Sequence, residues 1–349
     1  MDRTSKYRRI VIKAGSNVLT RDDGRPDTTR ISSLVDQIAR LHRAGIEVIL
    51  VSSGAVASGR SVLEQRTGRI DTVSARQLFS AVGQVKLLNR YYDLFNEYGI
   101  VCGQVLTTKE SLSTRRQYLN QRNCMEVMLA NGVIPIVNEN DTISVTELMF
   151  TDNDELSGLV AAMMQAEALI ILSNIDGIYD GSPSDPSSQV IRRVKPSEDL
   201  SRYIDPARSS RGRGGMATKS RISSRVAGEG IALALTGEEV LCTRFEPAPH
   251  TASGVKMWIA SSEGFAKGVL RIDEGAAAAV RASKAASILA VGVTAVEGDF
   301  ERDDLVRILS PDGTQLAVGR ISCDSETARR NIGRKGLKPL VHCDYLYLE

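Results

Sequence analysis

Four short polar segments in the first half of the chain follow apolar runs and contain side chains that could bind or transfer a charged group. They are Lys13-Ala14-Gly15-Ser16-Asn17, Ser52-Ser53-Gly54-Ala55, Asn138-Glu139-Asn140-Asp141 and Ser173-Asn174. Glycine lets backbone N–H groups approach an anion closely, and the N-terminus of a following helix adds a favourable dipole. Each segment alone is equally typical of an ordinary strand-to-helix turn. The four together favour a binding site for an anionic ligand.

Two lysines lie where they could bind phosphate. Lys13 ends an apolar run and is followed by Ala14 and Gly15. Its ammonium group is a point charge suited to binding phosphate. The alternative is a lysine that reaches water from the edge of a sheet. Lys219 lies in the glycine-rich segment RGRGGMATKS, which begins at Arg211. A dinucleotide fingerprint requires a preceding strand, which this segment does not have. The segment also lacks the residue spacing of a Walker A motif. It therefore predicts a loop that closes over nucleotide phosphates, with a disordered basic loop as the alternative.

The stretch TDNDELSGLV, residues 151–160, places three carboxylates and an amide in four residues before an apolar run. The spacing excludes an EF-hand, because leucine and serine occupy the next ligand position and the required glycine position. Thr151 or Asp152 can cap a helix by accepting backbone N–H groups, but a cap needs only one acid. The other polar groups could position a substrate amine, pair with the two lysines, or bind Mg2+ through water and phosphate.

The histidines give no support to a hydrolase or a zinc site. His42, His250 and His342 fall on a predicted helix and in loops, away from the four polar segments. Two lysines, glycine loops and a carboxylate–amide cluster instead favour phosphoryl transfer, in which positioning and charge neutralisation do most of the work.

The elements that must position these residues are predicted to form a mostly parallel sheet covered by helices. The strand candidates are RRIVIKAG, IEVILVSSG, GIVCGQVLT, GVIPIVNEN and ALIILSN. Between the first two, apolar residues recur at helical spacing from Ile31 to Leu41, with Thr28 or Thr29 as the cap and Gly45 as the stop. The apolar runs are continuous, which is typical of strands buried on both faces. Ligands bind such sheets at the carboxyl ends of the strands, where the polar segments lie.

From about Gly264 the pattern changes to short strand-like pieces broken by glycine and aspartate turns: GVLRID, AVGVTAVEG, LVRILS and QLAVGRIS. They predict a small, mostly β domain. We place the boundary at residue 263, which divides the chain into domains 1–263 and 264–349. The alanine run 276–279 is predicted to be helical.

Composition excludes several classes of protein. The 349 residues include 44 basic and 42 acidic side chains, so no net charge draws the chain to nucleic acid or membrane. No apolar run approaches the roughly 20 residues of a membrane span, and the N-terminal residues lack the apolar core of a signal peptide. Five scattered cysteines without a C-x-x-C pair indicate free thiols. We therefore expect a cytoplasmic protein without a membrane segment.

Several of these segments, taken in order, resemble the amino acid kinase family. They are VIKAGSNVLT, VSSGAVASGR, SAVGQ, VIPIVNENDTI, DNDELSGLVA, DGIYD and GGMATK. The C-terminal segment resembles the PUA domain, with RIDEGAAAAV and VTAVEGDF as its marks. The resemblance implies an α/β/α sandwich around a mostly parallel sheet, followed by a small PUA-like domain. It also implies ATP-dependent phosphorylation of the γ-carboxylate of L-glutamate, the first step of proline synthesis.

The same resemblance implies roles for individual residues. Lys13 and Lys219 would neutralise the transferring phosphoryl group, and Asp154, with Asp152, would hold the two lysines. Asp141 would pair with the α-ammonium group of glutamate. The other residues implied to bind glutamate are Ser53, Gly54, Asn138 and Asn153.

ATP would be bound by Lys13, by two residues after the fifth strand and by the glycine-rich segment. These residues are Ser173, Asn174, Arg213, Gly214, Gly215, Met216, Ala217, Thr218 and Lys219. Mg2+ is expected to be held through ATP and water, without a protein ligand. The family usually has Thr-Asp where this chain has Ser173-Asn174, and often threonine where it has Arg213. Both differences from the family pattern lie among the residues implied to bind ATP.

Alternative functions remain open at this stage. One is another member of the family, such as an N-acetylglutamate, aspartate or uridylate kinase, although NENDTI and the appended β domain weigh against it. The other is RNA binding through the C-terminal domain, which has a basic cluster from Arg329 to Lys338. Residues 264–349 nevertheless contain twelve basic and twelve acidic side chains, which favours a regulatory or oligomerising role over RNA binding. The resemblance further implies a homodimer or homotetramer and feedback inhibition by proline.

Overall fold

The computed structural model of the chain divides into two compact units. The first contains Met1–Ser111 and Leu119–Thr251, and the second contains Leu112–Tyr118 and Ala252–Glu349. The structure describes residues 7–63, 70–112, 114–144, 150, 152–183, 185–196, 198–203, 216–236, 242–249, 254–262, 265–282 and 286–348. The boundary predicted at residue 263 falls within the second unit and stays a prediction.

The first unit is built on one eight-stranded sheet, in the order β3-β4-β2-β1-β5-β7-β8-β6. Its strands are β1 (Arg9–Ala14), β2 (Glu47–Ser52), β3 (Cys102–Thr107), β4 (Ile134–Glu139), β5 (Ala168–Leu172), β6 (Arg193–Val194), β7 (Ala232–Thr236) and β8 (Cys242–Phe245). All pairs are parallel except β7 with β8. The five predicted strands are therefore present as β1 to β5, and β1, β2 and β4 are almost entirely buried because helices cover both faces.

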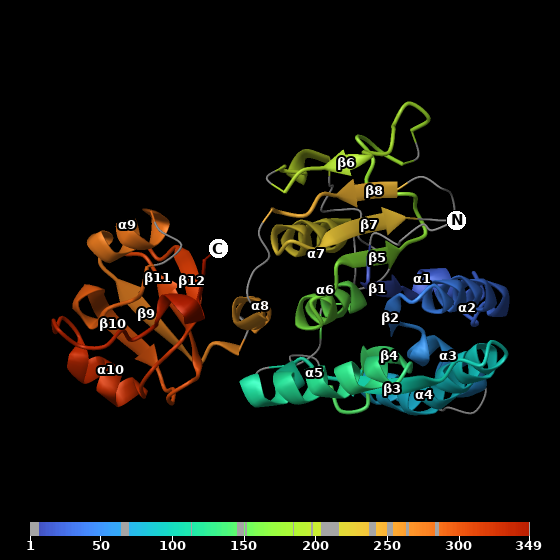
Figure 1. Cartoon of the computed structure of the whole chain (residues 1–349), viewed down its shortest axis with the longest axis horizontal. Coiled ribbons are helices and arrows are strands. Elements are labelled where there is room, and N and C mark those ends of the chain that lie inside the picture. Colours follow the sequence, from blue (N-terminus) through green and yellow to red (C-terminus); the bar gives the residue numbers. More distant parts are fainter. Residues whose placement is uncertain are drawn as a thin grey trace. The chain divides into compact units, whose positions relative to one another are not determined.

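Helices cover this sheet on both sides, which gives the predicted three layers (Figure 1). The helices between β1 and β8 are α1 (Ser16–Leu19), α2 (Thr28–Arg43), α3 (Ala55–Leu63), α4 (Thr72–Asn96), α5 (Arg115–Ala130), α6 (Asn153–Met163) and α7 (Met216–Gly228), and short 3-10 turns span Glu110–Leu112 and Ser201–Tyr203. Leu112 and the first four residues of α5 belong to the second unit. Apolar residues of α2 and α4 pack with one face of β1 and β2. Helices α6 and α7 contact each other, α6 contacts β1 and β5, and α7 contacts β7.

The cap of helix α2 lies one residue before the first predicted candidate, Thr28. The side chain of Asp27, rather than that of Thr28 or Thr29, accepts the backbone N–H of Arg30, so the threonine prediction was wrong. An aspartate accepts this bond as well as threonine does and adds a negative charge near the positive end of the helix dipole. Gly45 follows the helix with a φ of 82°, a left-handed conformation that favours glycine, as predicted for the stop.

Strand β1 determines the direction in which Lys13 points. Ile10, Ile12 and Ala14 belong to the apolar cluster shared with α2 and α4. Side chains alternate between the two faces of a strand, so Lys13 points to the opposite face, on which α6 lies. A lysine in a buried strand is thereby directed at the N-terminal turn of α6.

Two glycines allow α3 and α4 to pack with their backbones in contact. A Cβ atom on Gly59 would lie 1.8 Å from the carbonyl oxygen of Phe79, and one on Gly83 would lie 1.8 Å from that of Ala55. No side chain fits at either position without moving a backbone. This close packing fixes the N-terminal half of α4 beside the loop that follows β2.

The second unit contains a five-stranded sheet in the order β10-β9-β11-β12-β13. Its elements are α8 (Gly254–Ser261), β9 (Gly268–Ile272), α9 (Glu274–Ala282), β10 (Val293–Gly298), β11 (Leu305–Leu309), β12 (Gln315–Arg320), α10 (Ser325–Asn331) and β13 (Leu346–Leu348), with 3-10 turns at Ala290–Gly292 and Cys343–Tyr345. The four predicted strand pieces are β9 to β12, and the alanine run is helical in α9. The short strand β13 was not predicted.

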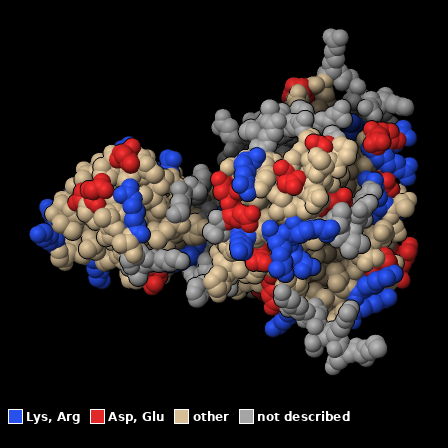
Figure 2. Space-filling model, turned by 90° about the horizontal axis from the view of Figure 1, so that it is seen from above, with Lys and Arg blue, Asp and Glu red and all other residues tan. Residues whose placement is uncertain are grey.

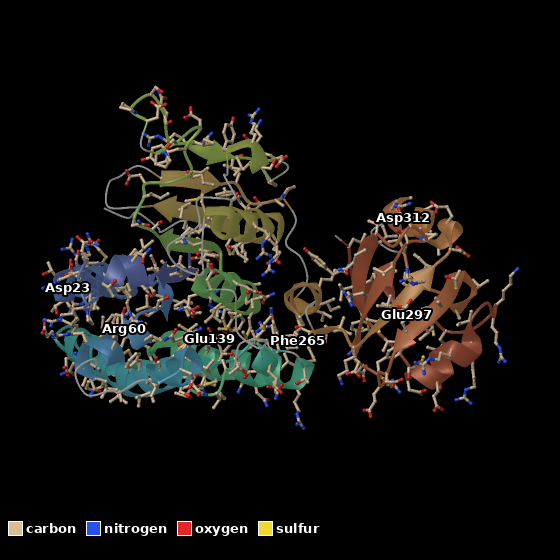
Figure 3. All side chains as sticks on the ribbon, turned by 180° about the vertical axis from the view of Figure 1, so that it is seen from behind. Asp23, Arg60, Glu139, Phe265, Glu297 and Asp312 are labelled. Carbon is tan, nitrogen blue, oxygen red and sulfur yellow. The ribbon has the colours of Figure 1, made fainter. Side chains whose placement is uncertain are left out.

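Several basic side chains of the second unit form ion pairs with acidic ones. Figure 2 shows basic and acidic side chains interspersed on the face in view. Glu297 on β10 (Figure 3), for example, accepts a hydrogen bond from Arg271 on β9 at 2.5 Å. Among the described residues of the whole chain, no helix is long and apolar enough to cross a membrane.

Candidate active site

A cavity of about 550 Å³ lies at the carboxyl ends of the central strands and is lined by residues of all four polar segments. Strand β1 lies between β2 and β5: the chain passes from β1 to β2 on one side and, after β4, continues in β5 on the other side. Such a switch point opens a crevice in α/β sheets, because the loops on its two sides diverge. The cavity is also lined by the first residues of α6 and by Lys219 of α7.

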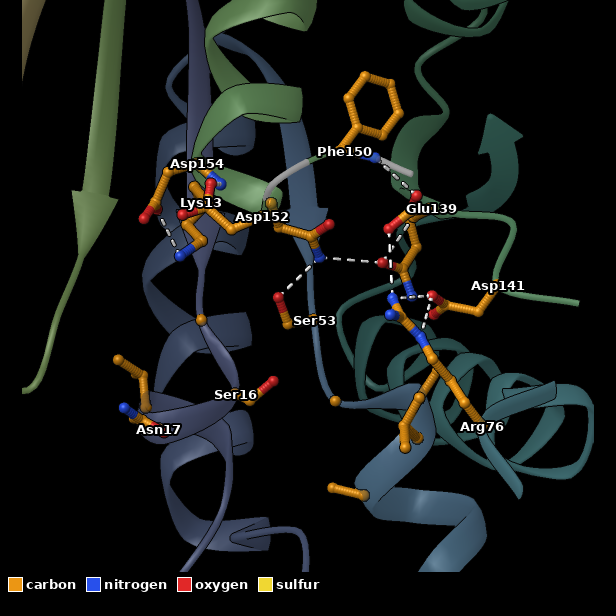
Figure 4. Close-up of a pocket in the computed structure, with 18 of the residues that line it drawn as sticks. Lys13, Ser16, Asn17, Ser53, Arg76, Glu139, Asp141, Phe150, Asp152 and Asp154 are labelled. Carbon is orange, nitrogen blue, oxygen red and sulfur yellow. Dashed lines mark hydrogen bonds and ion pairs between the residues drawn. The ribbon is translucent and has the colours of Figure 1, made fainter. Parts of the chain in front are cut away.

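Asp154 holds two lysines that are far apart in the sequence. Its Oδ1 atom forms an ion pair with Nζ of Lys13 at 2.5 Å (Figure 4). Its Oδ2 atom accepts a hydrogen bond from Nζ of Lys219 at 2.7 Å. Asp154 is fully buried, and Lys13 is only 5% exposed. The structure thus brings together the three residues that the resemblance predicted to act as a unit.

Burial and charge act in opposite directions on this group. Burial alone would raise the pKa of Asp154, but the two ammonium groups bring it below its ordinary value. Burial lowers the pKa of Lys13, Lys219 adds to this shift, and Asp154 opposes it. A Cβ atom on Gly15 would lie 3.0 Å from Nζ of Lys13, so the glycine leaves room for the ammonium group. The lysines are poised to receive an anion between them.

Asp152 caps helix α6, as one of the two predicted candidates. Its Oδ1 atom accepts the backbone N–H groups of Asp154 and Glu155, each at 2.9 Å. The other candidate, Thr151, lies outside the described residues. Burial and the nearby Asp154 carboxylate raise the pKa of Asp152. Its Oδ2 atom is buried without a hydrogen-bond partner among the described residues, although Asp152 lines the cavity.

An amide network joins three of the residues predicted to bind a substrate. Nδ2 of Asn153 donates to Oγ of Ser53 at 2.6 Å and to Oδ1 of Asn138 at 3.0 Å (Figure 4). Nδ2 of Asn138 donates in turn to Gln84 on α4 at 3.0 Å. Gly54, beside Ser53, has a φ of 101°, so a glycine is favoured at this turn. The network holds polar groups of β2, β4 and α6 at one side of the cavity.

Asp141 also lines the cavity, but its bonds reveal a residue that the sequence did not indicate. Arg76 on α4 donates from Nε to Oδ1 of Asp141 at 2.9 Å, and its Nη2 atom contacts the same oxygen. Nη2 also lies 3.5 Å from Oε2 of Glu139 (Figure 4). Arg76 lies 65 residues before Asp141, so no spacing in the sequence connects the two.

Glu139 is the most perturbed carboxyl group at this end of the cavity. Burial raises its pKa to about 7, the Asp141 carboxylate adds to the shift, and the backbone N–H of Phe150 and Arg76 oppose it. The N–H of Phe150 donates to Oε1 of Glu139 at 2.9 Å. This carboxyl group therefore changes its charge near neutral pH.

Glu139→Gln is expected to remove a pH dependence of stability. The folded protein keeps the Glu139 proton up to pH about 7, whereas the unfolded chain releases it near the ordinary pKa of 4.5. The folded state thus binds more protons in this window, and the free energy of unfolding of the wild type falls as pH rises, by up to about 3 kcal/mol. Thermal unfolding of both proteins from pH 5 to 8 measures the difference. The exposed Glu97→Gln serves as control, and parallel curves for wild type and Glu139→Gln would contradict the assignment.

Three of the residues predicted to bind a nucleotide line the other end of the cavity. Ser173 and Asn174 line it directly after β5, and Lys219 lines it from the first turn of α7. Met216, Ala217 and Thr218 form that first turn, where free backbone N–H groups favour a phosphate. Arg213, Gly214 and Gly215 lie outside the described residues, as does Arg211.

The cavity therefore has two chemically different ends with two lysines between them. One end carries amides and carboxylates suited to a small polar substrate, and the other carries a helix N-terminus suited to phosphates. Among the described residues, the only cluster of potential metal ligands of histidine, cysteine and acidic type is His342-Cys343-Asp344 in the second unit. The arrangement suits transfer of a phosphoryl group from one end to the other.

Comparison with known proteins agrees with this arrangement. The family model for the amino acid kinase family matches residues 8–236, and that for the PUA domain matches residues 268–342. A glutamate 5-kinase of Bacteroides thetaiotaomicron is 60% identical over 99% of both chains, and one of Chlorobaculum tepidum is 44% identical over 98% of both. Carbamate kinase from Giardia lamblia bound to AMP-PNP has a TM-score of 0.52 at 16% identity, covering 70% of this chain and 99% of its own, which shows the fold alone. The predicted fold class and both resemblances are confirmed.

Proposed function

The chain belongs to the amino acid kinase family, and on that premise we propose that it transfers the γ-phosphoryl group of ATP to the γ-carboxylate of L-glutamate. The products are γ-glutamyl phosphate and ADP. The observation that carries the proposal is the placement of Lys13 and Lys219 on the two oxygens of Asp154, between the two ends of the cavity. The names of the relatives, glutamate 5-kinases, support glutamate as the acceptor.

The reaction needs no general base. A carboxylate is already ionised at neutral pH, so an oxygen of the γ-carboxylate attacks the γ-phosphorus directly as the bond to the β-phosphate oxygen breaks. Negative charge spreads over the transferring group and the leaving ADP. Lys13 and Lys219 neutralise that charge from fixed positions, which is the main catalytic contribution expected of such a site. Asp154 keeps both ammonium groups in place between turnovers.

The amide network and Asp141 form the glutamate end of the cavity. Ser53, Asn138 and Asn153 are linked by hydrogen bonds and present polar groups to the substrate. Gly54 lets the backbone after β2 approach it. The Asp141 carboxylate takes the α-ammonium group, an assignment that the resemblance suggests and its position in the cavity supports.

Ser173, Asn174 and the first turn of α7 form the ATP end. Mg2+ accompanies ATP in such reactions, and when bound it supplies positive charge to the β- and γ-phosphates. Asp152 fits this ion, because its buried Oδ2 atom lacks a partner among the described residues and carboxylate oxygens are ligands that Mg2+ prefers. Asp152 would hold the ion through a water molecule while its Oδ1 atom continues to cap α6.

The alternatives have less support. N-acetylated substrates lack the α-ammonium group that Asp141 would bind. RNA binding by the PUA domain has less support, because acidic side chains are interspersed among the basic ones on the face that Figure 2 shows. The cytoplasmic location remains a prediction from the composition, and a homo-oligomer and feedback inhibition by proline remain predictions from the resemblance.

A hydroxamate assay tests the proposed function. With ATP, Mg2+ and hydroxylamine, the wild-type protein is expected to form γ-glutamyl hydroxamate from L-glutamate, because hydroxylamine traps acyl phosphates. Aspartate and N-acetylglutamate are the comparison substrates, and proline is added to a parallel series. Hydroxamate from either comparison substrate but not from glutamate would contradict the assignment of glutamate as the acceptor.

A further inference from the structure

Arg76 is a basic residue of the cavity that the mechanism does not use. Its guanidinium group lies between two buried carboxylates, bonded to Asp141 and 3.5 Å from Glu139. The Arg76 side chain is 22% exposed, and it lines the cavity. It is therefore placed where a bound substrate could reach it.

The pairing with Arg76 favours the ionised form of Asp141. Burial raises the pKa of Asp141, and the positive charge and hydrogen bonds of Arg76 oppose this, with a further hydrogen bond from Ser80. A neutral Asp141 could not attract an ammonium group. The pair thus presents a negative and a positive group in direct contact at the glutamate end of the cavity.

The α-carbon of a free amino acid carries the complementary pattern, since its ammonium and carboxylate groups are attached to one atom. A guanidinium group forms two parallel hydrogen bonds with a carboxylate, which gives both strength and direction. We propose that Arg76 binds the α-carboxylate of the substrate beside the α-ammonium site on Asp141, so that together they select a free α-amino acid. This inference rests on the proposed function, which supplies glutamate as the acceptor.

The other basic residues of the cavity are less suited to this role. Among the described residues, the basic side chains that line it are Lys13, Arg60, Arg76 and Lys219. Both lysines are bound to Asp154 and face the phosphoryl group. The guanidinium carbon of Arg60 lies 5.8 Å from the centre of the Phe79 ring, a cation–π contact. Arg76 alone of these four is bonded to the carboxylate assigned to the α-ammonium group.

Two truncated substrates separate the two halves of the subsite. 4-Aminobutanoate keeps the amine and the reacting carboxylate of glutamate but lacks the α-carboxylate, and glutarate keeps both carboxylates but lacks the amine. We would measure kcat/KM for glutamate and both analogues by the hydroxamate assay. The variants are Arg76→Gln, Arg76→Lys and Asp141→Asn, with Arg60→Gln as the competing candidate and Arg90→Gln, an exposed residue at the far end of α4, as control.

Arg76→Gln is expected to lower kcat/KM for glutamate by about 100-fold, mostly through KM, and to lower kcat/KM for 4-aminobutanoate by only about 10-fold or less. The smaller loss reflects the weakened Asp141 site, which both substrates use, whereas only glutamate also loses the bond to its α-carboxylate. The ratio of kcat/KM for glutamate to kcat/KM for 4-aminobutanoate should therefore fall by about tenfold or more. Arg76→Lys should recover part of it, because the charge remains and the forked geometry is lost. Asp141→Asn should instead reduce the preference for glutamate over glutarate, and the KM for ATP should change little in any variant.

Three outcomes would overturn the inference while the proposed function stands. In the first, Arg76→Gln lowers kcat/KM for glutamate and 4-aminobutanoate by the same factor, as a residue that only positions Asp141 would. In the second, the loss of preference appears in Arg60→Gln instead. In the third, Arg90→Gln reproduces the effect, which would indicate a general disturbance of α4. A wild-type protein that forms no hydroxamate from glutamate would overturn the proposed function and this inference with it.

Discussion

Replacing Lys219 with alanine is expected to lower kcat by about 100- to 1,000-fold while changing the KM for glutamate by less than about threefold. The reason is the position of its ammonium group, 2.7 Å from Asp154 and at the boundary between the two ends of the cavity. Negative charge on the transferring group is greatest in the transition state, so the loss of this cation acts on turnover more than on substrate binding. Steady-state hydroxamate formation over a range of glutamate and ATP concentrations separates the two effects.

The same helix offers a matched control for the Lys219 variant. Arg221 lies two residues further along α7 and is exposed, so Arg221→Ala removes a positive charge without touching the cavity. Its kcat should stay within about twofold of the wild type, as expected of a surface substitution. Unchanged turnover in Lys219→Ala would remove Lys219 from the mechanism, and an equal loss in Arg221→Ala would point to a defect of the helix as a whole.

Replacing Asp154 with asparagine is expected to impair both turnover and stability. A neutral amide leaves Lys13 buried and without its counter-charge, and breaking a buried ion pair in this way costs about 3–5 kcal/mol of the free energy of unfolding. The ammonium groups also lose the carboxylate that fixes their positions, so kcat should fall by about 100-fold or more. Thermal unfolding and the hydroxamate assay measure the two effects on the same preparation.

A second substitution and a pH series identify charge as the cause of the loss of stability. Asp154→Asn combined with Lys13→Met should be more stable than Asp154→Asn alone, because the unpaired buried cation is gone, although the double variant stays inactive. The lowered pKa of Asp154 means that its carboxylate stabilises the folded state above the pKa of the unfolded chain, about 4. The difference between wild type and Asp154→Asn should therefore shrink as pH falls below about 4. A double variant no more stable than Asp154→Asn would indicate that lost packing, not charge, causes the effect.

Much of the scaffold could be predicted because it depends on local sequence patterns. The continuous apolar runs form β1 to β5, and the polar segments at their ends line the cavity. The order of residues in TDNDELSGLV predicted a helix cap, and Asp152 provides it. Each of these features depends on residues within a few positions of one another, where hydrogen bonding and the periodicity of burial leave few choices. The cap of α2 was misassigned because threonine and aspartate compete for this role locally, and Asp27 occupies it.

The contacts between distant segments needed the tertiary structure. The sequence alone indicates that Asp141 is acidic and follows a strand, but its bond to Arg76 exists because α4 is held beside that strand end. That position depends on Gly59 and Gly83, at which α3 and α4 pack backbone to backbone, and no local pattern predicts such an approach. The sequence by itself therefore determined the strands, the polar loops at their ends and the chemistry they could carry. The tertiary structure decided which charges meet, because partners 65 residues apart are brought together only by the packing of whole helices.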